Sequence, residues 1–239
     1  MCTLEKRGNI FFLTLTGAGD ADDEHRLGLP VISSLLTALS DAASQSTRGS
    51  VLITTARGKF FSNGFDLAWA QSSGDASSAL RQMVVAFKPV VAALLSLPMP
   101  TVAALPGHAA AAGFLLALSH DYVTMRGDRG VLYMSEVDLG LGLPDYFAAA
   151  FRAKIGSVSA RRDILQRGMK VGGEEAVRMG IVDSAHESAE AAVEAAVRMA
   201  EKLGERKWKG DVYAEIRMSL YPELCAEVGL SKAVPKAKL

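Results

Sequence analysis

Two segments of the chain combine small residues with polar ones in a pattern that can present backbone amides to a ligand. They are Lys59-Phe-Phe-Ser-Asn-Gly-Phe-Asp-Leu67 and Leu105-Pro-Gly-His-Ala-Ala-Ala-Ala-Gly-Phe-Leu115. Gly64 permits a sharp turn that leaves the next N–H free. Alanines at the start of a helix leave the first-turn amides unshielded. Two such amides can form an oxyanion hole, which stabilises negative charge as it develops on a carbonyl oxygen.

Each segment taken alone also has an ordinary structural explanation. The first can be a strand-to-helix turn in which Asp66 is the N-cap. The small residues of the second also suit close packing of a helix. The two segments together favour the chemical interpretation, because each follows a short predicted strand.

A third segment carries carboxylates that could move a proton. Glu136 lies among Val131, Leu132, Tyr133, Met134, Val137 and Leu139. Apolar surroundings raise the pKa of a carboxyl group and make it a better proton shuttle near neutral pH. Asp138 is the rival, because two residues further along an extended segment it faces the same way. An exposed loop glutamate is the alternative that the residues alone favour.

The elements that must position these segments are visible in the hydrophobic pattern. Strands are predicted at Ile10–Leu15, Ser50–Thr55, Thr101–Leu105, Tyr122–Met125 and Val131–Met134. Helices are predicted at Val31–Ala43, Ala79–Leu97, Ala109–Leu118, Tyr146–Lys154, Ala160–Arg167, Gly173–Met179, Ala189–Leu203 and Asp211–Leu220. Strands and helices alternate for most of the chain, and helices then follow almost alone. This order is typical of an α/β fold with mainly parallel strands.

Length and charge exclude several classes of protein. The chain has 239 residues, with 26 basic and 26 acidic side chains and a formal net charge of +0. Nucleic-acid binding needs a clustered basic excess, so we expect no nucleic-acid partner. The uncharged stretch 89–120 is long enough to span a membrane, but Pro98, Pro100 and Pro106 interrupt it, so we expect no membrane segment.

Three sequence blocks resemble the signature blocks of the crotonase (enoyl-CoA hydratase/isomerase) superfamily. They are Phe60-Phe-Ser-Asn-Gly-Phe-Asp-Leu67, then Pro106-Gly-His-Ala-Ala-Ala-Ala-Gly113 with Ser119-His-Asp-Tyr122, and Leu132-Tyr-Met-Ser-Glu-Val-Asp-Leu-Gly140. Within the superfamily, the chain more closely resembles the plant peroxisomal Δ3,Δ2-enoyl-CoA isomerases. The resemblance implies a spiral of ββα units with a C-terminal helical region that builds trimers. It suggests a core over residues 1–180, with the helical region and a targeting tail over 181–239.

The resemblance also assigns roles to residues of this chain. It implies that the amides of Phe65 and Ala112 form the oxyanion hole and that Glu136, rather than Asp138, is the catalytic base. The residues expected to contact an acyl-CoA thioester substrate are Ser62, Asn63, Gly64, Asp66, Leu67, His108, Gly113 and Leu115. Neither a metal nor a cofactor is expected, because coenzyme A is part of the substrate.

Leu115 marks a departure from part of the superfamily. Hydratases of this superfamily carry a second glutamate at the corresponding position, and no acidic residue lies between Asp75 and Asp121 here. The departure favours Δ3,Δ2-enoyl-CoA isomerisation by a single glutamate. The alternatives are a dienoyl-CoA isomerase or enoyl-CoA hydratase on the same fold, or a non-catalytic acyl-CoA-binding protein.

The chain ends in Ala237-Lys238-Leu239, which is similar to the peroxisomal signal Ser-Lys-Leu. We therefore expect a peroxisomal enzyme whose tail is bound by the import receptor. The resemblance implies assembly as a homotrimer or a dimer of trimers.

Overall fold

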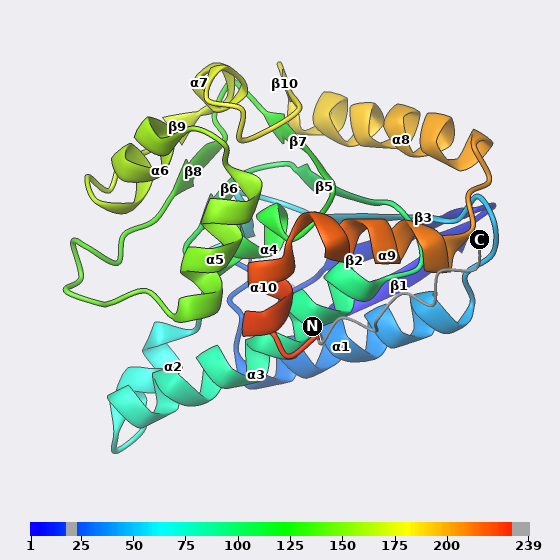
Figure 1. Ribbon diagram of the computed structural model, residues 1–239. Helices are drawn as coiled ribbons and strands as arrows, with labels where there is room; N and C mark the ends of the chain where they lie inside the picture. Colours follow the sequence, from blue (N-terminus) through cyan, green and yellow to red (C-terminus); the bar gives the residue numbers. More distant parts are fainter. Residues whose placement is uncertain (18–22, 231–239) are drawn as a thin grey trace.

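The computed structural model describes residues 1–17 and 23–230, which form two β-sheets with helices around them (Figure 1). Six strands form the larger sheet in the order β1-β2-β3-β5-β7-β10. They are β1 (Cys2–Arg7), β2 (Ile10–Leu15), β3 (Val51–Ala56), β5 (Thr101–Leu105), β7 (Tyr122–Arg126) and β10 (Ser184–His186). Four short strands form the smaller sheet: β4 (Phe60–Ser62), β6 (His108–Ala110), β8 (Val131–Tyr133) and β9 (Val171–Gly172).

Parallel pairing dominates both sheets, which confirms the predicted α/β class. The five strands β2, β3, β5, β7 and β10 pair in parallel, and so do β4, β6 and β8. Only the outer pairs β1–β2 and β8–β9 are antiparallel among the described strands.

The chain repeats one unit three times, which agrees with the expected spiral of ββα units. In each unit the first strand joins the larger sheet and the second joins the smaller one. The pair β3–β4 leads to α2 (Leu67–Ser72) and α3 (Ala76–Ser96), β5–β6 to α4 (Ala112–Leu118), and β7–β8 to α5 (Asp145–Lys154). Each unit therefore places a strand end of the smaller sheet immediately before a turn or a helix.

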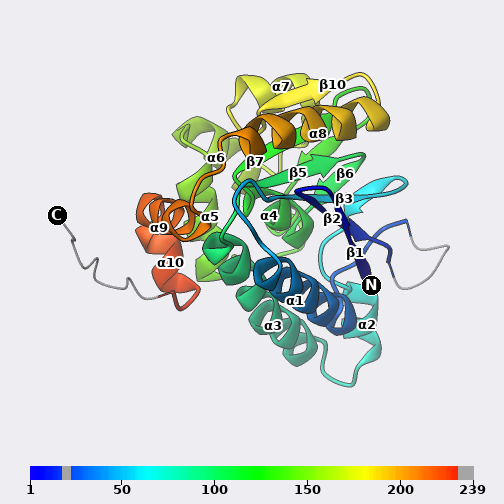
Figure 2. The same cartoon turned by 90° about the vertical axis from the view of Figure 1, so that its right-hand side faces the viewer.

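Helices cover both faces of the larger sheet (Figure 2). On one face, Val51, Ile53 and Val102 pack with Ala196 and Ala200 of α8 (Ala189–Glu205). On the other face lie α1 (Leu29–Ser44) and α3, whose apolar side chains belong to the main core. The remaining helices are α6 (Val158–Leu165), α7 (Gly173–Arg178), α9 (Gly210–Leu220) and α10 (Pro222–Glu227).

One helix of the described chain, α3, is long and apolar enough to cross a membrane by length and composition alone. Its packing is that of a core helix, since Met83, Phe87, Val90 and Val91 are fully buried in the protein. The predicted helix Ala79–Leu97 is thus confirmed, with a start three residues earlier.

A buried arginine ties the C-terminal helices to this core. Arg217 of α9 donates to the carbonyl oxygens of four residues at the end of α3 and just beyond it, Leu94, Leu95, Leu97 and Met99. The same guanidinium binds both carboxylate oxygens of Asp121, each at 2.6 Å.

The expected boundary between a core over residues 1–180 and a C-terminal region over 181–239 stays a prediction. Both β10 and α8 follow residue 180, yet β10 belongs to the larger sheet and α8 covers it.

The alanine-rich segment differs from its prediction. We expected a helix from Ala109, but His108–Ala110 is strand β6 and the helix begins only at Ala112. Alanine favours helix in isolation, but here β4 and β8 supply hydrogen-bonding partners on both sides of the strand. The sequence also did not reveal β1, β4, β9, β10, α2 or α10.

Candidate active site

Three parallel strands of the smaller sheet end at the same edge, and the predicted functional segments follow them directly. Gly64 and Phe65 come just after β4, Ala111 and Ala112 after β6, and Glu136 shortly after β8. Because β4 pairs with β6 and β6 with β8, the topology alone brings the three segments together.

The first segment is a tight turn that only glycine accommodates easily. Gly64 has a φ of 77°, in the region that side-chain-bearing residues rarely adopt. A Cβ added there would lie 3.0 Å from the Ala111 side chain and 3.4 Å from the amide nitrogen of Ala112. The Gly64 carbonyl accepts a hydrogen bond from the Leu27 amide at 2.8 Å, which helps to orient the planar peptide group that carries the Phe65 N–H. The two amide-bearing segments are therefore in contact at Gly64.

The second segment contains a strained residue. Ala111 has a φ of 50° and a ψ of −121°, although it is not glycine, and its N–H donates to the carbonyl of Tyr133 at 3.0 Å. This turn ends β6 and starts α4 at Ala112. Within the described part of the chain, neither the Phe65 nor the Ala112 amide donates to a protein acceptor. Both donors therefore remain available to a ligand, as an oxyanion hole requires.

Glu136 is a partly buried carboxyl group whose oxygen Oε2 is inaccessible to solvent and has no hydrogen-bond partner among the described residues. Burial raises the pKa of Glu136, and hydrogen bonds from the backbone amides of Glu136 and Ser135 offset part of this effect. Asp138, the rival carboxylate, is exposed, because residues 136–140 form a turn and not the extended segment we assumed. Of the apolar neighbours along the sequence, Tyr133 and Leu139 line the same cavity as Glu136, whereas Val137 is 47% exposed.

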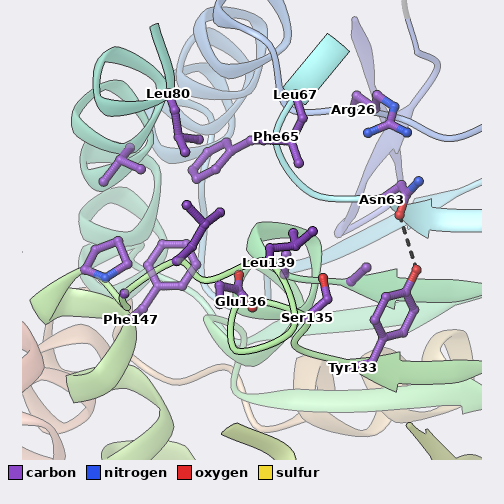
Figure 3. A pocket seen from close by; sticks show the side chains of 16 residues that line it. Arg26, Asn63, Phe65, Leu67, Leu80, Tyr133, Ser135, Glu136, Leu139 and Phe147 are labelled. Carbon is purple, nitrogen blue, oxygen red and sulfur yellow. Dashed lines mark hydrogen bonds between the residues drawn. The ribbon is translucent and has the colours of Figure 1, made fainter. Parts of the chain in front are cut away.

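The other residues around Glu136 come from distant parts of the chain, and together they enclose a cavity of about 270 Å³ (Figure 3). Apolar side chains form one end, on the left of the view, and polar ones form the other, with Glu136 between them. The lining residues are Arg26, Asn63, Phe65, Leu67, Leu80, Val84, Ala110, Ala111, Tyr133, Ser135, Glu136, Leu139, Leu141, Gly142, Pro144 and Phe147. Glu136 is the one carboxylate among them.

The structure brings some of the predicted site residues to this cavity and leaves others outside its lining. Asn63, Phe65, Leu67 and Glu136 line it, whereas Gly64 and Ala112 do not line it but adjoin Ala111, which does. The residues that do not line it are Ser62, Asp66, His108, Gly113 and Leu115.

Most of these outlying residues have evident structural tasks. The Ser62 hydroxyl donates to the carbonyl of His25 at 2.8 Å, and Asp66 caps α2 by accepting from the Trp69 amide. Gly113 lets the chain approach the backbone of Ser62, and Leu115 is completely buried in α4. Contact of these residues with an acyl-CoA stays a prediction.

His108 lies at the other end of β6, packed edge-on against Phe60 with 5.1 Å between ring centroids. Burial lowers its pKa, and so do the charges of Lys59, Arg126 and Lys170. In the described ranges, no three His, Cys, Asp or Glu side chains are grouped in a way that could hold a metal ion.

Sequence reasoning missed most of the cavity wall. Leu80 and Val84 of α3 and Phe147 of α5 lie far along the chain from the three blocks, and only packing brings them to Glu136. Arg26 and Tyr133 were also missed as lining residues. Arg26 reaches the cavity because the next residue, Leu27, pairs with Phe65 in an isolated parallel bridge. Nothing in the sequence indicates that pairing.

Comparison with known proteins agrees with this geometry. Residues 26–238 match the family model described as enoyl-CoA hydratase/isomerase. The chain is 65% identical over 238 residues, 98% of each chain, to the Arabidopsis thaliana protein named enoyl-CoA delta isomerase 2, peroxisomal. It is 50% identical to enoyl-CoA delta isomerase 1, peroxisomal, of the same plant, over 94% of this chain and 91% of the relative. The chain belongs to the enoyl-CoA hydratase/isomerase family.

Solved structures share the fold. A probable enoyl-CoA hydratase from Mycobacterium tuberculosis superposes with a TM-score of 0.83 at 21% identity, covering 95% of this chain and 91% of the other. A structure described as an enoyl-CoA isomerase from the same bacterium superposes with a TM-score of 0.81 at 21% identity, covering 95% and 96%. The predicted crotonase fold is confirmed.

Burial of the Glu136 carboxyl predicts that this side chain lowers stability. Its raised pKa means that the folded protein holds the proton to higher pH than the unfolded chain does, so ionisation near neutral pH costs free energy of folding. We expect Glu136→Gln to raise the midpoint of thermal unfolding near neutral pH. The gain should vanish in acid, below the pKa of an unfolded-chain glutamate, where wild type is protonated in both states.

The matched control is Glu201→Gln, at an exposed position on α8, which should leave the midpoint unchanged at both pH values. A Glu136→Gln protein whose midpoint equals that of wild type at neutral pH would show that the carboxyl is well solvated.

Proposed function

We propose that this chain is a Δ3,Δ2-enoyl-CoA isomerase that moves the double bond of a 3-enoyl-CoA to give trans-2-enoyl-CoA during β-oxidation of unsaturated fatty acids. Two plant relatives named enoyl-CoA delta isomerases support this activity through 65% and 50% identity over nearly the whole chain. The observation that carries the choice of reaction is that Glu136 is the one carboxylate among the described lining residues. Addition of water in the manner of the hydratases uses two.

The arrangement suggests how the reaction proceeds. The thioester carbonyl oxygen lies between the amides of Phe65 and Ala112, which stabilise the charge that forms on it. Glu136 takes a proton from C2, leaving a dienolate whose negative charge rests largely on that oxygen. The protonated carboxyl then delivers a proton to C4, and the double bond ends between C2 and C3. The reaction has no net gain or loss of atoms, and we propose that it uses no cofactor.

Replacement of the base tests this function. We expect Glu136→Gln to lower kcat/KM for 3-hexenoyl-CoA by about 10²–10⁴-fold, the usual contribution of a general base. Asp138→Asn, two residues away and exposed, is the control and should retain wild-type activity. Formation of conjugated 2-enoyl-CoA is followed by absorbance. Equal activity of Glu136→Gln and wild type would remove Glu136 as the base, and hydration of crotonyl-CoA as fast as isomerisation would favour a hydratase.

The dependence of kcat/KM on pH should also show the raised pKa of Glu136. Because burial raises the pKa of Glu136, the carboxylate form is lost at a higher pH than for an ordinary glutamate, whose pKa is about 4.3. The value of kcat/KM for wild type should therefore fall as the pH drops through this raised pKa.

The apolar end of the cavity predicts the position of the acyl chain. Leu80, Val84 and Phe147 line this end, and we propose that the carbons beyond C4 lie against them. Val84→Phe should then lower kcat/KM for long-chain 3-enoyl-CoA esters by at least roughly 10-fold, because the added ring is larger than the single methylene whose misfit costs about 10–200-fold. Short-chain esters should be unaffected.

Val85→Phe is the matched control, because Val85 is the next residue of α3 and is 64% exposed. The measurement is kcat/KM over a series of chain lengths with all three proteins. Equal chain-length profiles for Val84→Phe and Val85→Phe would place the acyl chain elsewhere.

We further propose that the enzyme is peroxisomal, in line with the names of the two plant relatives. The import receptor would bind Ala237, Lys238 and Leu239, which lie outside the described residues. A fluorescent protein fused to the N-terminus should enter peroxisomes with the whole chain and stay in the cytosol when these three residues are removed. Import of the shortened fusion would show that another signal directs it.

We also propose that the protein assembles as a homotrimer or a dimer of trimers through its C-terminal helical region, as the family resemblance implies. The mass in solution, measured by light scattering, distinguishes three or six copies from one.

A further inference from the structure

Tyr133 contacts both amide-bearing segments of the site. It is the last residue of β8 and lies in register with Ala110, the last residue of β6. Its carbonyl oxygen accepts the hydrogen bond from Ala111, the strained residue that precedes Ala112. The main chain of Tyr133 thus helps to hold the turn that directs the Ala112 amide.

The side chain of Tyr133 reaches the other amide segment. Its hydroxyl donates to Oδ1 of Asn63 at 3.3 Å, as the dashed line in Figure 3 shows. The main chain of Asn63 is held as well, because its backbone N–H donates to the carbonyl of Glu24 at 2.7 Å. Gly64 and Phe65 follow Asn63 directly, so the hydrogen bond acts two residues from the Phe65 amide.

The Tyr133 ring is itself restrained. It is half-buried, and the ammonium of Lys170 lies over it at 5.4 Å from the ring centroid. Burial is the largest cause that raises the pKa of Tyr133, so the hydroxyl keeps its proton and remains a donor at working pH. Along the chain, Glu136 follows only three residues later.

We propose that Tyr133 is a positioning residue that sets the separation of the two oxyanion-hole amides, through its hydroxyl on Asn63 and its carbonyl on Ala111. The proposal rests on the proposed isomerase function. An oxyanion hole is effective only when its donors are held in place before charge develops, and a misplacement of about 1 Å can cost about 10²-fold in rate. A cross-link between the two segments supplies that restraint.

The test is Tyr133→Phe, which removes the hydroxyl and keeps both the ring beneath Lys170 and the carbonyl bond to Ala111. We expect kcat for 3-hexenoyl-CoA to fall by about 2- to 12-fold, the effect of losing one neutral hydrogen bond. KM and the affinity for saturated hexanoyl-CoA, measured by calorimetry, should stay at wild-type values, because the restraint acts on the transition state.

A double-mutant cycle separates this role from a general loss of structure. Asn63→Ala should lower kcat by a similar factor, and the double variant should lose no more than either single one, because both remove the same bond. Tyr213→Phe is the matched control, since Tyr213 is also partly buried but stacks on Trp208 and does not line the cavity. It should retain wild-type kcat.

Two results would overturn the proposal: an unchanged kcat in Tyr133→Phe, with or without a raised KM, or additive losses in the double variant. The raised KM would mean that the hydroxyl binds substrate directly. Absence of isomerisation by the wild-type protein is a different outcome, because it would contradict the proposed function and not the role of Tyr133 within it.

Discussion

The site depends on the parallel hydrogen-bonded pairing of three very short strands, β4, β6 and β8. Parallel strands end at a common edge, so a pairing of only two or three residues places two backbone turns and one carboxylate side by side. Gly107 and Gly113 flank β6, and a Cβ at either position would collide with the backbone of the β4 segment. The close approach of β4 and β6 therefore requires glycine at both places.

At this edge of the smaller sheet, the features that the proposed catalysis needs lower the stability of the fold. An oxyanion hole needs amide donors without protein acceptors, and a proton shuttle needs a carboxylate that is poorly solvated. Both features cost folding free energy, as does the positive φ of Ala111. The surrounding structure holds these features in place. Helix α3 contributes Leu80 and Val84 to the cavity wall, and Arg217 ties the other end of this helix to α9. The proposed acyl-CoA would bind in one orientation, because one end of the cavity is apolar and the other is polar.

Much of the framework could be predicted from the sequence because the central strands and long helices have strong hydrophobic patterns. Ile10–Leu15 and Thr101–Leu105 match their predicted bounds. The strands of the smaller sheet are too short to show any alternation, and β6 consists of His108 and two alanines, which favour helix until β4 and β8 flank them. The charged strand β1 was missed because it lies at the edge of the larger sheet, where four of its six residues are exposed.

Glu136 and the Phe65 turn could be identified from motif resemblance, but the cavity wall could not. Leu80 and Val84 are ordinary apolar residues of a helix, and their exposure to the cavity follows from how α3 packs against distant segments. Likewise, nothing near Tyr133 in the sequence indicates that its hydroxyl reaches Asn63, seventy residues earlier.

A crystal structure with bound acetoacetyl-CoA, whose enolate resembles the dienolate, tests the central claim most directly. In that complex we expect the thioester oxygen to lie about 2.7–3.1 Å from the amide nitrogens of both Phe65 and Ala112, with the Glu136 carboxyl against C2. A thioester oxygen bound by other groups, or Glu136 turned away from C2 in that complex, would contradict it.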